Sequence, residues 1–433
     1  MTLRNIKNPF VLFLPFFIFY VILVFVKPTH GIEGDEGRYL NFAQNLIHGF
    51  YSPPAPNINL WNGPGYPILL VPFVVFHLPL ICITLLNAIL NYFSIILLFK
   101  TLQQYVPFKM AFIFSLFWAC YYISYGELVV IYTEVFTSFL ITLLIFYLVK
   151  SFNIGNKSIK NAIFSGLIIG YIVLTRVIFG YVLLVMLIGF ALLFVLNKKV
   201  INYRRGLLIL LVAMITITPY LIYTYHLTGK LYYLGDSGGM SLYWMTSSNE
   251  NELGDWHHER DVHYVPTLNS KIEITADQKM IPGWNNSLYL NHFEDYKKID
   301  QYVGVERDDT YKKIALSNIR RNPVKYLKNI VSNVERLFFN FPYSYTLQHS
   351  SIKIAFSGMV VIGMIFSLFI SLINFRKIEF PLMFIIIFVI IYLGLTILVS
   401  AYPRMFTVIV PILLFWICYI IQKSIKIKFK FIG

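Results

Sequence analysis

Long apolar runs alternate with short polar segments over most of this chain. Runs at 9–26, 108–125, 129–149 and 352–373 approach or exceed the ~18 residues that a helix needs to cross a bilayer. Further candidate spans lie at 80–99, 162–174, 178–196, 207–225, 380–399 and 406–421. The pattern predicts an all-α multi-pass membrane protein of about ten transmembrane helices, with one large polar loop between the seventh and the eighth.

The first polar segment carries a helical pattern of its own. After Gly34, apolar residues at Tyr39, Ala43 and Leu46 are spaced as on one face of a helix. This spacing predicts an amphipathic helix on the membrane surface, capped by Asp35 and stopped by Gly49. The prolines from 53 to 67 are expected to exclude regular helix up to the second span.

The large loop ends in a helical segment over 309–321, followed by a basic amphipathic run through Arg336. We expect this run to lie at the membrane surface, either as a strut or with its basic residues on anionic headgroups. These residues are Arg320, Arg321, Lys325 and Lys328. The chain thus divides into a transmembrane module at 1–225, a loop region at 226–350, and C-terminal transmembrane helices with a basic tail at 351–433.

Composition supports the membrane interpretation. Hydrophobic residues make up 57% of the chain and charged residues 13%, which excludes a water-soluble globular protein of 433 residues. The net charge of +15 is concentrated on one side when the N-terminus is placed inside, and the loop at 226–350 is almost neutral. This one-sidedness is the positive-inside signal. It predicts cytoplasmic termini and an extracytoplasmic loop, and it leaves no need for a nucleic-acid partner.

The first apolar run follows basic residues as a signal peptide does, but no small-residue cleavage site comes after it. We therefore expect an uncleaved span. Cys82, Cys120 and Cys418 all fall in apolar spans, so no disulfide or zinc framework is predicted.

Acidic residues near the span ends are candidates for chemistry. Asp35 and Glu36 follow the first span, and two interpretations stay open. They could be a helix cap with a first-turn charge, or a carboxylate held ionised at a helix N-terminus as a general base. Glu134 lies within an apolar run, where burial of a charge is costly and therefore often functional.

Two arginines and a histidine cluster complete the candidate residues. Arg176 and Arg404 lie at extracytoplasmic span ends and are either rim anchors or a clamp for a phosphate, which guanidinium groups match in bidentate fashion. His257, His258 and His263 are candidate metal ligands, although their spacing matches no standard zinc pattern.

The order of these motifs resembles the GT-C glycosyltransferases related to protein O-mannosyltransferases and lipid A aminoarabinose transferase. The resemblance spans nearly the whole chain. It is carried by Gly34-Asp35-Glu36 with Tyr39, Asn62-Gly63-Pro64-Gly65-Tyr66-Pro67, Thr133-Glu134, Leu174-Thr175-Arg176, Ser237-Gly238-Gly239, Asn322-Pro323 and Pro403-Arg404.

The resemblance implies a GT-C-like fold in a prokaryotic plasma or inner membrane, with an extracytoplasmic active site. It implies a polyprenyl-phosphate-linked sugar as donor and a lipid, glycan or protein as acceptor. Asp35 matches the acid that serves as base, with Glu36 as its partner and Glu134 as the second acid. Arg176 and Arg404 match arginines at the rim of the site, and we add Tyr39 and Tyr66 to the substrate-binding set.

One departure from the family concerns the donor phosphate. Some relatives have a lysine before the proline pair of the first loop, where this chain has Asn62-Gly63-Pro64-Gly65. Arg176, Arg404 or a bound divalent cation would then stabilise the leaving phosphate. A single displacement with one base and no separate nucleophile predicts inversion. The alternatives are a transporter or flippase for lipid-linked sugars, and an O-antigen ligase or polymerase.

Overall fold

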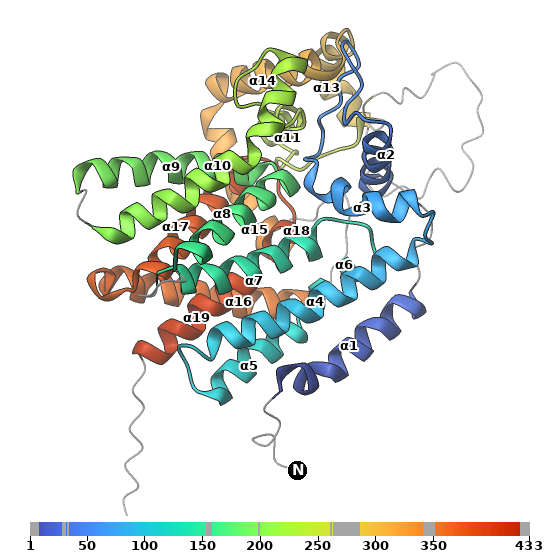
Figure 1. Cartoon of the computed structure of the whole chain (residues 1–433). Helices are drawn as coiled ribbons and strands as arrows, with labels where there is room; N and C mark the ends of the chain where they lie inside the picture. The colour runs from blue at the N-terminus through green and yellow to red at the C-terminus, as the bar shows by residue number, and fades with distance from the viewer. Residues whose placement is uncertain are drawn as a thin grey trace, which may run out of the picture.

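The computed structural model describes residues 8–27, 32, 34–152, 158–197, 200–259, 262, 286–340 and 351–424. These residues form helices and connecting segments, with no β-strand among them (Figure 1). The helices of the first half are α1 (Pro9–Val26), α2 (Asp35–Ile47), α3 (Gly65–Val75), α4 (Ile81–Leu102), α5 (Phe108–Ala119), α6 (Tyr122–Leu128), α7 (Glu134–Ser151), α8 (Ser158–Thr175), α9 (Ile178–Leu196) and α10 (Ile201–Thr228). Those of the second half are α11 (Gly238–Met245), α13 (Asn286–Ile299), α14 (Gly304–Arg321), α15 (Pro323–Phe339), α16 (Ser351–Ile373), α17 (Phe380–Ile397), α18 (Pro403–Thr407) and α19 (Val410–Ser424).

The described part of the chain contains 8 helices that are long and apolar enough to cross a membrane, namely α1, α4, α7, α8, α9, α10, α16 and α17. Helices α5 and α6 together form a ninth candidate, bent by 51° at the break between them. Helix α19 is apolar but shorter. The all-helical multi-pass architecture is confirmed, and the total of about ten spans stays a prediction.

Helix α19 is surrounded by other helices. It packs against α16 and α17 and also against α4, α5 and α7. Every residue from Val410 to Ile420 is buried, so a helix of only 15 residues is enclosed by its neighbours. This packing joins the first seven helices to the C-terminal ones and fixes α18, the short helix immediately before α19.

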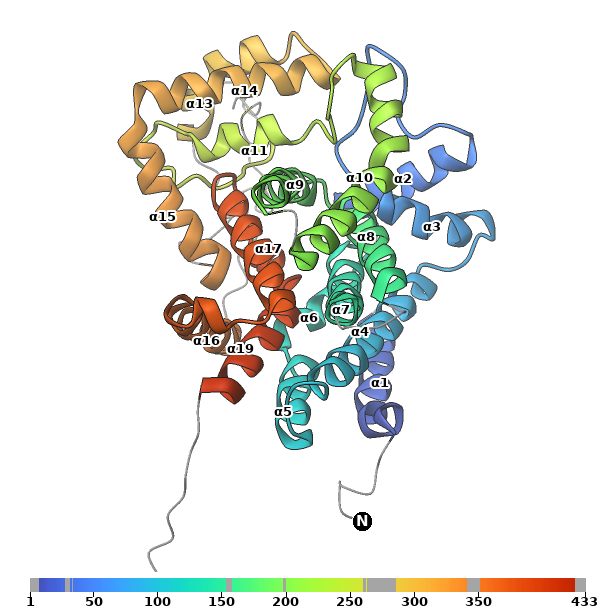
Figure 2. The same ribbon diagram turned by 60° about the vertical axis from the view of Figure 1, so that its left-hand side comes forward.

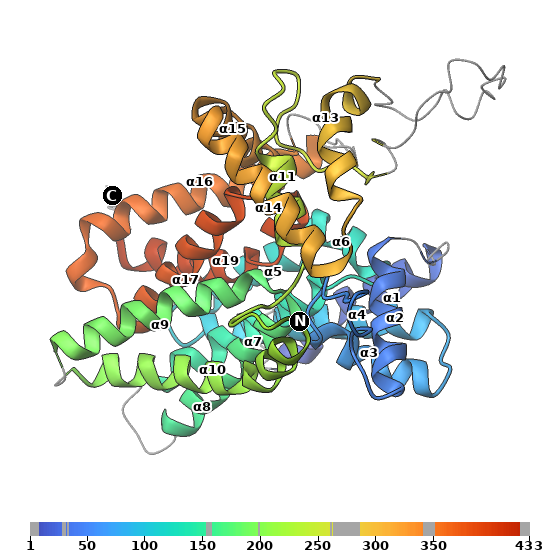
Figure 3. The ribbon, with the colours of Figure 1, turned by 90° about the horizontal axis from the view of Figure 1, so that it is seen from above.

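Helices α2 and α3 lie side by side (Figure 3), and α3 also contacts α8 and α4. The predicted amphipathic helix is present as α2, and its place on the membrane surface stays a prediction, but its predicted cap is wrong. Gly34 is the N-cap residue, with a φ of 54° that suits glycine, and Asp35 is the first helical residue without a capping hydrogen bond. The expected exclusion of helix is also wrong, because α3 forms with Pro67 in its first turn, where a backbone N–H has no intrahelical partner.

Helices α11, α13 and α14 form a separate layer, here called the polar subdomain (Figure 1). Its core contains the buried rings of Tyr243, Trp244, Tyr296 and Tyr311. Helix α15 runs from this subdomain to α16 and also contacts α17 and α18 (Figure 2). The predicted headgroup contact of Lys325 is wrong, because this side chain is buried and its ammonium donates to the carbonyl of Glu252 at 2.7 Å.

Candidate active site

Asp35 lies between two arginines at the start of α2. Its Oδ2 accepts a hydrogen bond from Nη1 of Arg404 at 2.9 Å, and its Oδ1 pairs with Arg38 one turn further along the helix. Burial acts to raise the pKa of Asp35, but Arg404 and then Arg38 outweigh it, so the pKa is lowered from its ordinary value. The carboxylate is thus held ionised and fixed in direction.

Glu134 is the first residue of α7 and is almost fully buried, with 3% of its side chain exposed. Its Oε1 lies 3.3 Å from Nη1 of Arg176 and 3.7 Å from Nε of Arg404. The partial positive charge at the N-terminus of α7 also favours an acid at this position. Arg404 therefore bridges Asp35 and Glu134, and the structure brings together the residues that the sequence singled out at 35, 134, 176 and 404.

Aromatic rings support two of the arginines. The guanidinium of Arg404 lies 5.3 Å from the ring centroid of Tyr132, and that of Arg38 lies 5.0 Å from the ring centroid of Trp61. Such stacking holds a cation in place while leaving its N–H groups available for an anion. The Asp35–Glu134–Arg38–Arg176–Arg404 group is called the charged cluster below.

Glu36 has a different partner from its neighbour Asp35. Its side chain is buried, and Oε1 accepts a hydrogen bond from the backbone N–H of Ile131 at 2.8 Å. This bond ties α2 to the segment that leads into α7 and so sets the separation of Asp35 and Glu134. The two adjacent acids of the sequence therefore point to different partners.

Tyr39 and Tyr66 lie beside the charged cluster. Their rings pack edge to face at 5.1 Å, and the hydroxyl of Tyr39 accepts a hydrogen bond from Nδ2 of Asn62 at 3.1 Å. Among the residues that the structure describes, several buried polar atoms of this region have no hydrogen-bond partner. They are Oε2 of Glu134, the hydroxyl of Tyr66, Oδ1 of Asn62 and Nε of Arg38. Buried polar atoms normally have partners, so this concentration suits a polar ligand.

The histidine candidates lie elsewhere. The ring of His257 packs on Trp244 at 5.0 Å and that of His258 on Trp256 at 5.4 Å, both next to the polar subdomain. His263 lies outside the described residues. No group of three or more His, Cys, Asp or Glu residues in the described part of the chain could hold a metal ion. The cysteines at 82, 120 and 418 are free.

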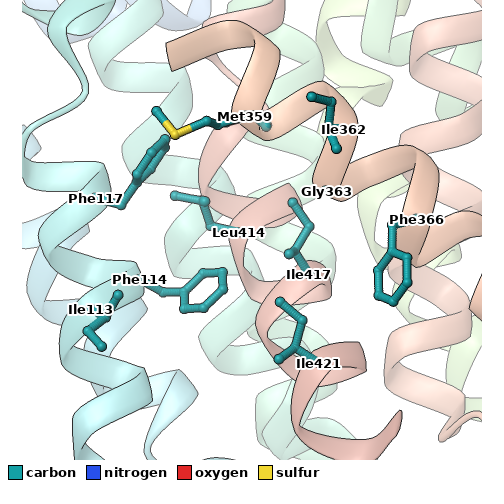
Figure 4. Close-up of a pocket in the computed structure, with 11 residues that line it drawn as sticks. Ile113, Phe114, Phe117, Met359, Ile362, Gly363, Phe366, Leu414, Ile417 and Ile421 are labelled. Atoms are coloured by element: carbon teal, nitrogen blue, oxygen red, sulfur yellow. The ribbon is translucent and has the colours of Figure 1, made fainter. Parts of the chain in front are cut away.

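A cavity of about 490 Å³ lies between α5, α16 and α19, away from the charged cluster (Figure 4). Its lining is apolar throughout and includes Phe117, Met359, Phe366 and Ile417. No lining residue can transfer a proton or bind an anion. The candidate active site is therefore assigned by the charged cluster and not by the volume of a cavity.

Three residues of the site were missed from the sequence. Arg38 is three residues after Asp35, a spacing at which helical side chains meet, so this pair could have been found. Tyr132 and Trp61 meet the arginines only through the fold, and the sequence gives no signal for those contacts.

No family model matches the chain, and no curated protein matches it. Among solved structures, the chain is similar to ArnT from Cupriavidus metallidurans bound to undecaprenyl phosphate, with a TM-score of 0.41 and 11% identity over 93% of this chain and 78% of that one. It is also similar to the Archaeoglobus fulgidus oligosaccharyltransferase tethered with an acceptor peptide, with a TM-score of 0.49 and 12% identity over 95% of this chain and 49% of that one. This chain thus spans about half the length of the oligosaccharyltransferase.

Both proteins are GT-C glycosyltransferases, the class that the sequence resemblance names. Because both TM-scores are below 0.5, the function proposed below rests on the charged cluster and not on this likeness.

Proposed function

We propose that this chain is a membrane glycosyltransferase that moves a sugar from a polyprenyl-phosphate donor to an extracytoplasmic glycolipid, polysaccharide or protein. The observation that carries the proposal is the bridge that Arg404 makes between Asp35 and Glu134. Guanidinium groups bind phosphate, and a fixed carboxylate can accept the proton of an attacking hydroxyl or amine. The charged cluster supplies both groups at one place.

The position of the charged cluster supports a lipid-linked donor. Asp35 and Glu134 begin helices, Arg176 lies in the turn between two spans, and Arg404 lies in α18 just before α19. All four residues therefore lie at helix ends, where the phosphate of a lipid would meet the protein. The same placement favours a transferase over a transporter, for which ionisable residues in the middle of spans are typical.

Because Asp35 is paired with Arg38 and Arg404, binding of the donor would change how readily this carboxylate accepts a proton. Two guanidinium groups lower the pKa of Asp35, and a carboxylate so stabilised accepts a proton reluctantly. A donor phosphate competes for the same N–H groups of Arg38 and Arg404. As their hydrogen bonds turn to the phosphate, Asp35 loses stabilising partners and becomes a stronger base.

The transfer itself is then a single displacement. The acceptor oxygen or nitrogen gives its proton to Asp35 and attacks the anomeric carbon. The bond between that carbon and the phosphate oxygen breaks, and the lipid phosphate leaves with the electron pair, stabilised by Arg404 and Arg38. One displacement inverts the anomeric configuration. Glu134 keeps Arg176 and Arg404 in place, and its Oε2 and the hydroxyl of Tyr66 can bind hydroxyl groups of the sugar.

Mass spectrometry of lipids and surface glycans tests the proposal. Cells without the protein, and cells that make only the Asp35→Asn variant, should accumulate the same lipid-phosphate sugar and lose the same surface modification. Purified wild-type protein should transfer sugar from that lipid and not from a nucleotide sugar alone. Transfer from the nucleotide sugar without lipid carrier would refute the proposed donor. If removal of the protein depletes lipid-linked sugar from one leaflet while transfer of the sugar itself is retained, the protein would be a transporter.

A further inference from the structure

Helix α15 buries its polar face. Asn329, Asn333 and Arg336 have 0% of their surface exposed, although asparagine and arginine are seldom fully buried. Buried polar groups are costly unless hydrogen-bonded, so the partners of these side chains indicate what they hold. Each of them binds backbone groups at the end of a helix or in the irregular segment that follows it.

The first of these segments is the connector between α17 and α18. Nδ2 of Asn333 donates to the carbonyls of Ile397 and Val399 at 3.0 and 2.6 Å, and Oδ1 accepts from the N–H of Ala401 at 2.9 Å. Nε of Arg336 donates to the carbonyl of Ala401 at 3.2 Å.

The hydroxyl of Tyr326 donates a hydrogen bond to the carbonyl of Leu398 at 3.0 Å. Side chains of a single helix thus bind four carbonyls and one amide of the connector. Arg404 follows Ala401 by three residues.

The second segment follows α11 in the polar subdomain. Nδ2 of Asn329 donates to the carbonyls of Met245 and Ser247 at 3.1 and 3.0 Å. The two Nη atoms of Arg336 donate to the carbonyls of Leu253 and Gly254 at 3.3 and 2.9 Å. Helix α15 therefore fastens the connector to the polar subdomain.

We propose that Asn333 and Arg336 are positioning residues for Arg404. They touch neither donor nor acceptor, and they act by fixing the connector so that the guanidinium of Arg404 meets Asp35 and Glu134. The functional part of this inference rests on the proposed role of Arg404 as a phosphate clamp. According to this inference, the polar subdomain helps to set the geometry of the charged cluster through α15.

Asn329 provides a matched control. It is the same residue type on the same helix, it is equally buried, and it also donates to two carbonyls, but it holds the other segment. Hydrogen exchange by mass spectrometry should show uptake in 396–407 becoming about tenfold faster or more in Asn333→Ala and unchanged in Asn329→Ala. Asn329→Ala should speed exchange in 245–255 instead. Unaltered exchange of 396–407 in Asn333→Ala would overturn the proposal.

Binding of a polyprenyl monophosphate in detergent micelles, which needs no turnover, gives the second measurement. Arg404→Ala and Asn333→Ala should each weaken binding by about tenfold or more, and the double variant should be no weaker than Arg404→Ala alone. Asn329→Ala should stay within about twofold of the wild type. Tyr326→Phe, which loses one bond at a partly exposed site, should weaken binding by about twofold to threefold and serves if Asn333→Ala fails to fold.

The outcomes separate the two proposals. If Arg404→Ala weakens binding and neither Asn333→Ala nor Tyr326→Phe does, the positioning role is wrong and the clamp stands. Additive losses in the double variant would also overturn the positioning role. If Arg404→Ala leaves binding unchanged, the phosphate clamp is wrong, and the exchange pattern alone decides whether α15 fixes the connector.

Discussion

Two buried polar networks of this protein differ in how fully their acids are hydrogen-bonded. In the polar subdomain, Oε1 of Glu252 accepts from Asn291 at 2.8 Å, while Oε2 accepts from the hydroxyl of Ser247 and lies 2.8 Å from Nε2 of His292. In the charged cluster, Oε2 of Glu134 has no hydrogen-bond partner among the described residues. A saturated network stabilises a fold, whereas unsatisfied buried atoms need a ligand.

The partners of the two networks differ as well. His292 is almost fully buried and its Nδ1 lies 2.5 Å from the hydroxyl of Tyr243, so it cannot leave Glu252 without exposing polar groups. Arg404 and Arg38 keep about a third of their side chains exposed, at 33% and 35%, and can turn toward a phosphate. We therefore expect the hydrogen bonds of Glu252 to stabilise the fold, and the ion pairs of Asp35 to be open to replacement by a ligand.

Replacing Asp35 should have the largest effect on activity. Asp35→Asn removes the proton acceptor and leaves the helix cap at Gly34 untouched, so turnover should fall by about 10²–10⁴-fold, with a much smaller loss of thermal stability from the ion pairs with Arg404 and Arg38. Transfer from the lipid-linked donor by purified protein measures this. Glu252→Gln, the counterpart in the saturated network, should keep near-normal turnover at neutral pH. A stable Asp35→Asn variant with normal turnover would show that the base lies elsewhere.

Breaking the pair of Arg176 and Glu134 should cost stability. Arg176→Ala leaves the nearly buried carboxylate of Glu134 with Arg404, at 3.7 Å, as its remaining ion-pair partner, and we expect a loss of about 3–5 kcal/mol in thermal or denaturant unfolding. The double variant Arg176→Met with Glu134→Gln removes both charges and should recover most of that loss. Equal stability of Arg176→Ala and wild type would mean that the pair is not a structural one.

The saturated network should give a pH dependence of its own. Burial raises the pKa of Glu252, but His292, Ser247 and Asn291 outweigh it and lower it from 4.5 to about 2. A depressed carboxylate pKa stabilises the folded state above pH 4.5, and this contribution, roughly 3 kcal/mol, is lost as the pH falls from 4.5 toward 2. Glu252→Gln should flatten the stability curve in that window, while the exposed Glu250→Gln should leave it unchanged.

Labelling of single-cysteine variants should place both networks on the same side of the membrane. The variants themselves should keep normal activity. In a variant without Cys82, Cys120 and Cys418, probes at Gln44 on α2 and at Asn251 near the polar subdomain should react from outside the cell. A probe at Asn197, between α9 and α10, should react only after permeabilisation. Reaction of Gln44 and Asn251 from opposite sides would separate the two regions and refute the proposed orientation.

The sequence predicted the spans and the candidate residues better than it predicted their contacts. Apolar runs indicate spans because lipid demands them, and the surface helix at 35–47 followed from its periodicity. The cap was assigned to Asp35 because capping preferences do not show that Gly34 has a positive φ. The bridge from Asp35 to Arg404 joins residues 369 positions apart, and nothing local to either residue predicts it.

The polar face of α15 was misinterpreted for a related reason. A basic amphipathic helix is typical of a membrane surface, and the pattern is the same whether its polar face meets headgroups or protein carbonyls. Only the tertiary structure shows Lys325 and Arg336 against backbone oxygens of the segment at 250–254. Arg320, Arg321 and Lys328 still lie outside those contacts and remain available for headgroups.

The bridge between Asp35 and Arg404 also has a consequence for biosynthesis. At roughly 5–20 residues per second, a ribosome makes Arg404 about 20–75 s after Asp35, because 369 residues separate them. Glu134 is made 99 residues after Asp35, and both acids then lack the guanidinium that joins them until Arg404 is made. The nascent protein therefore cannot assemble its charged cluster until α18 has been made, and the proposed donor site is complete only from that point.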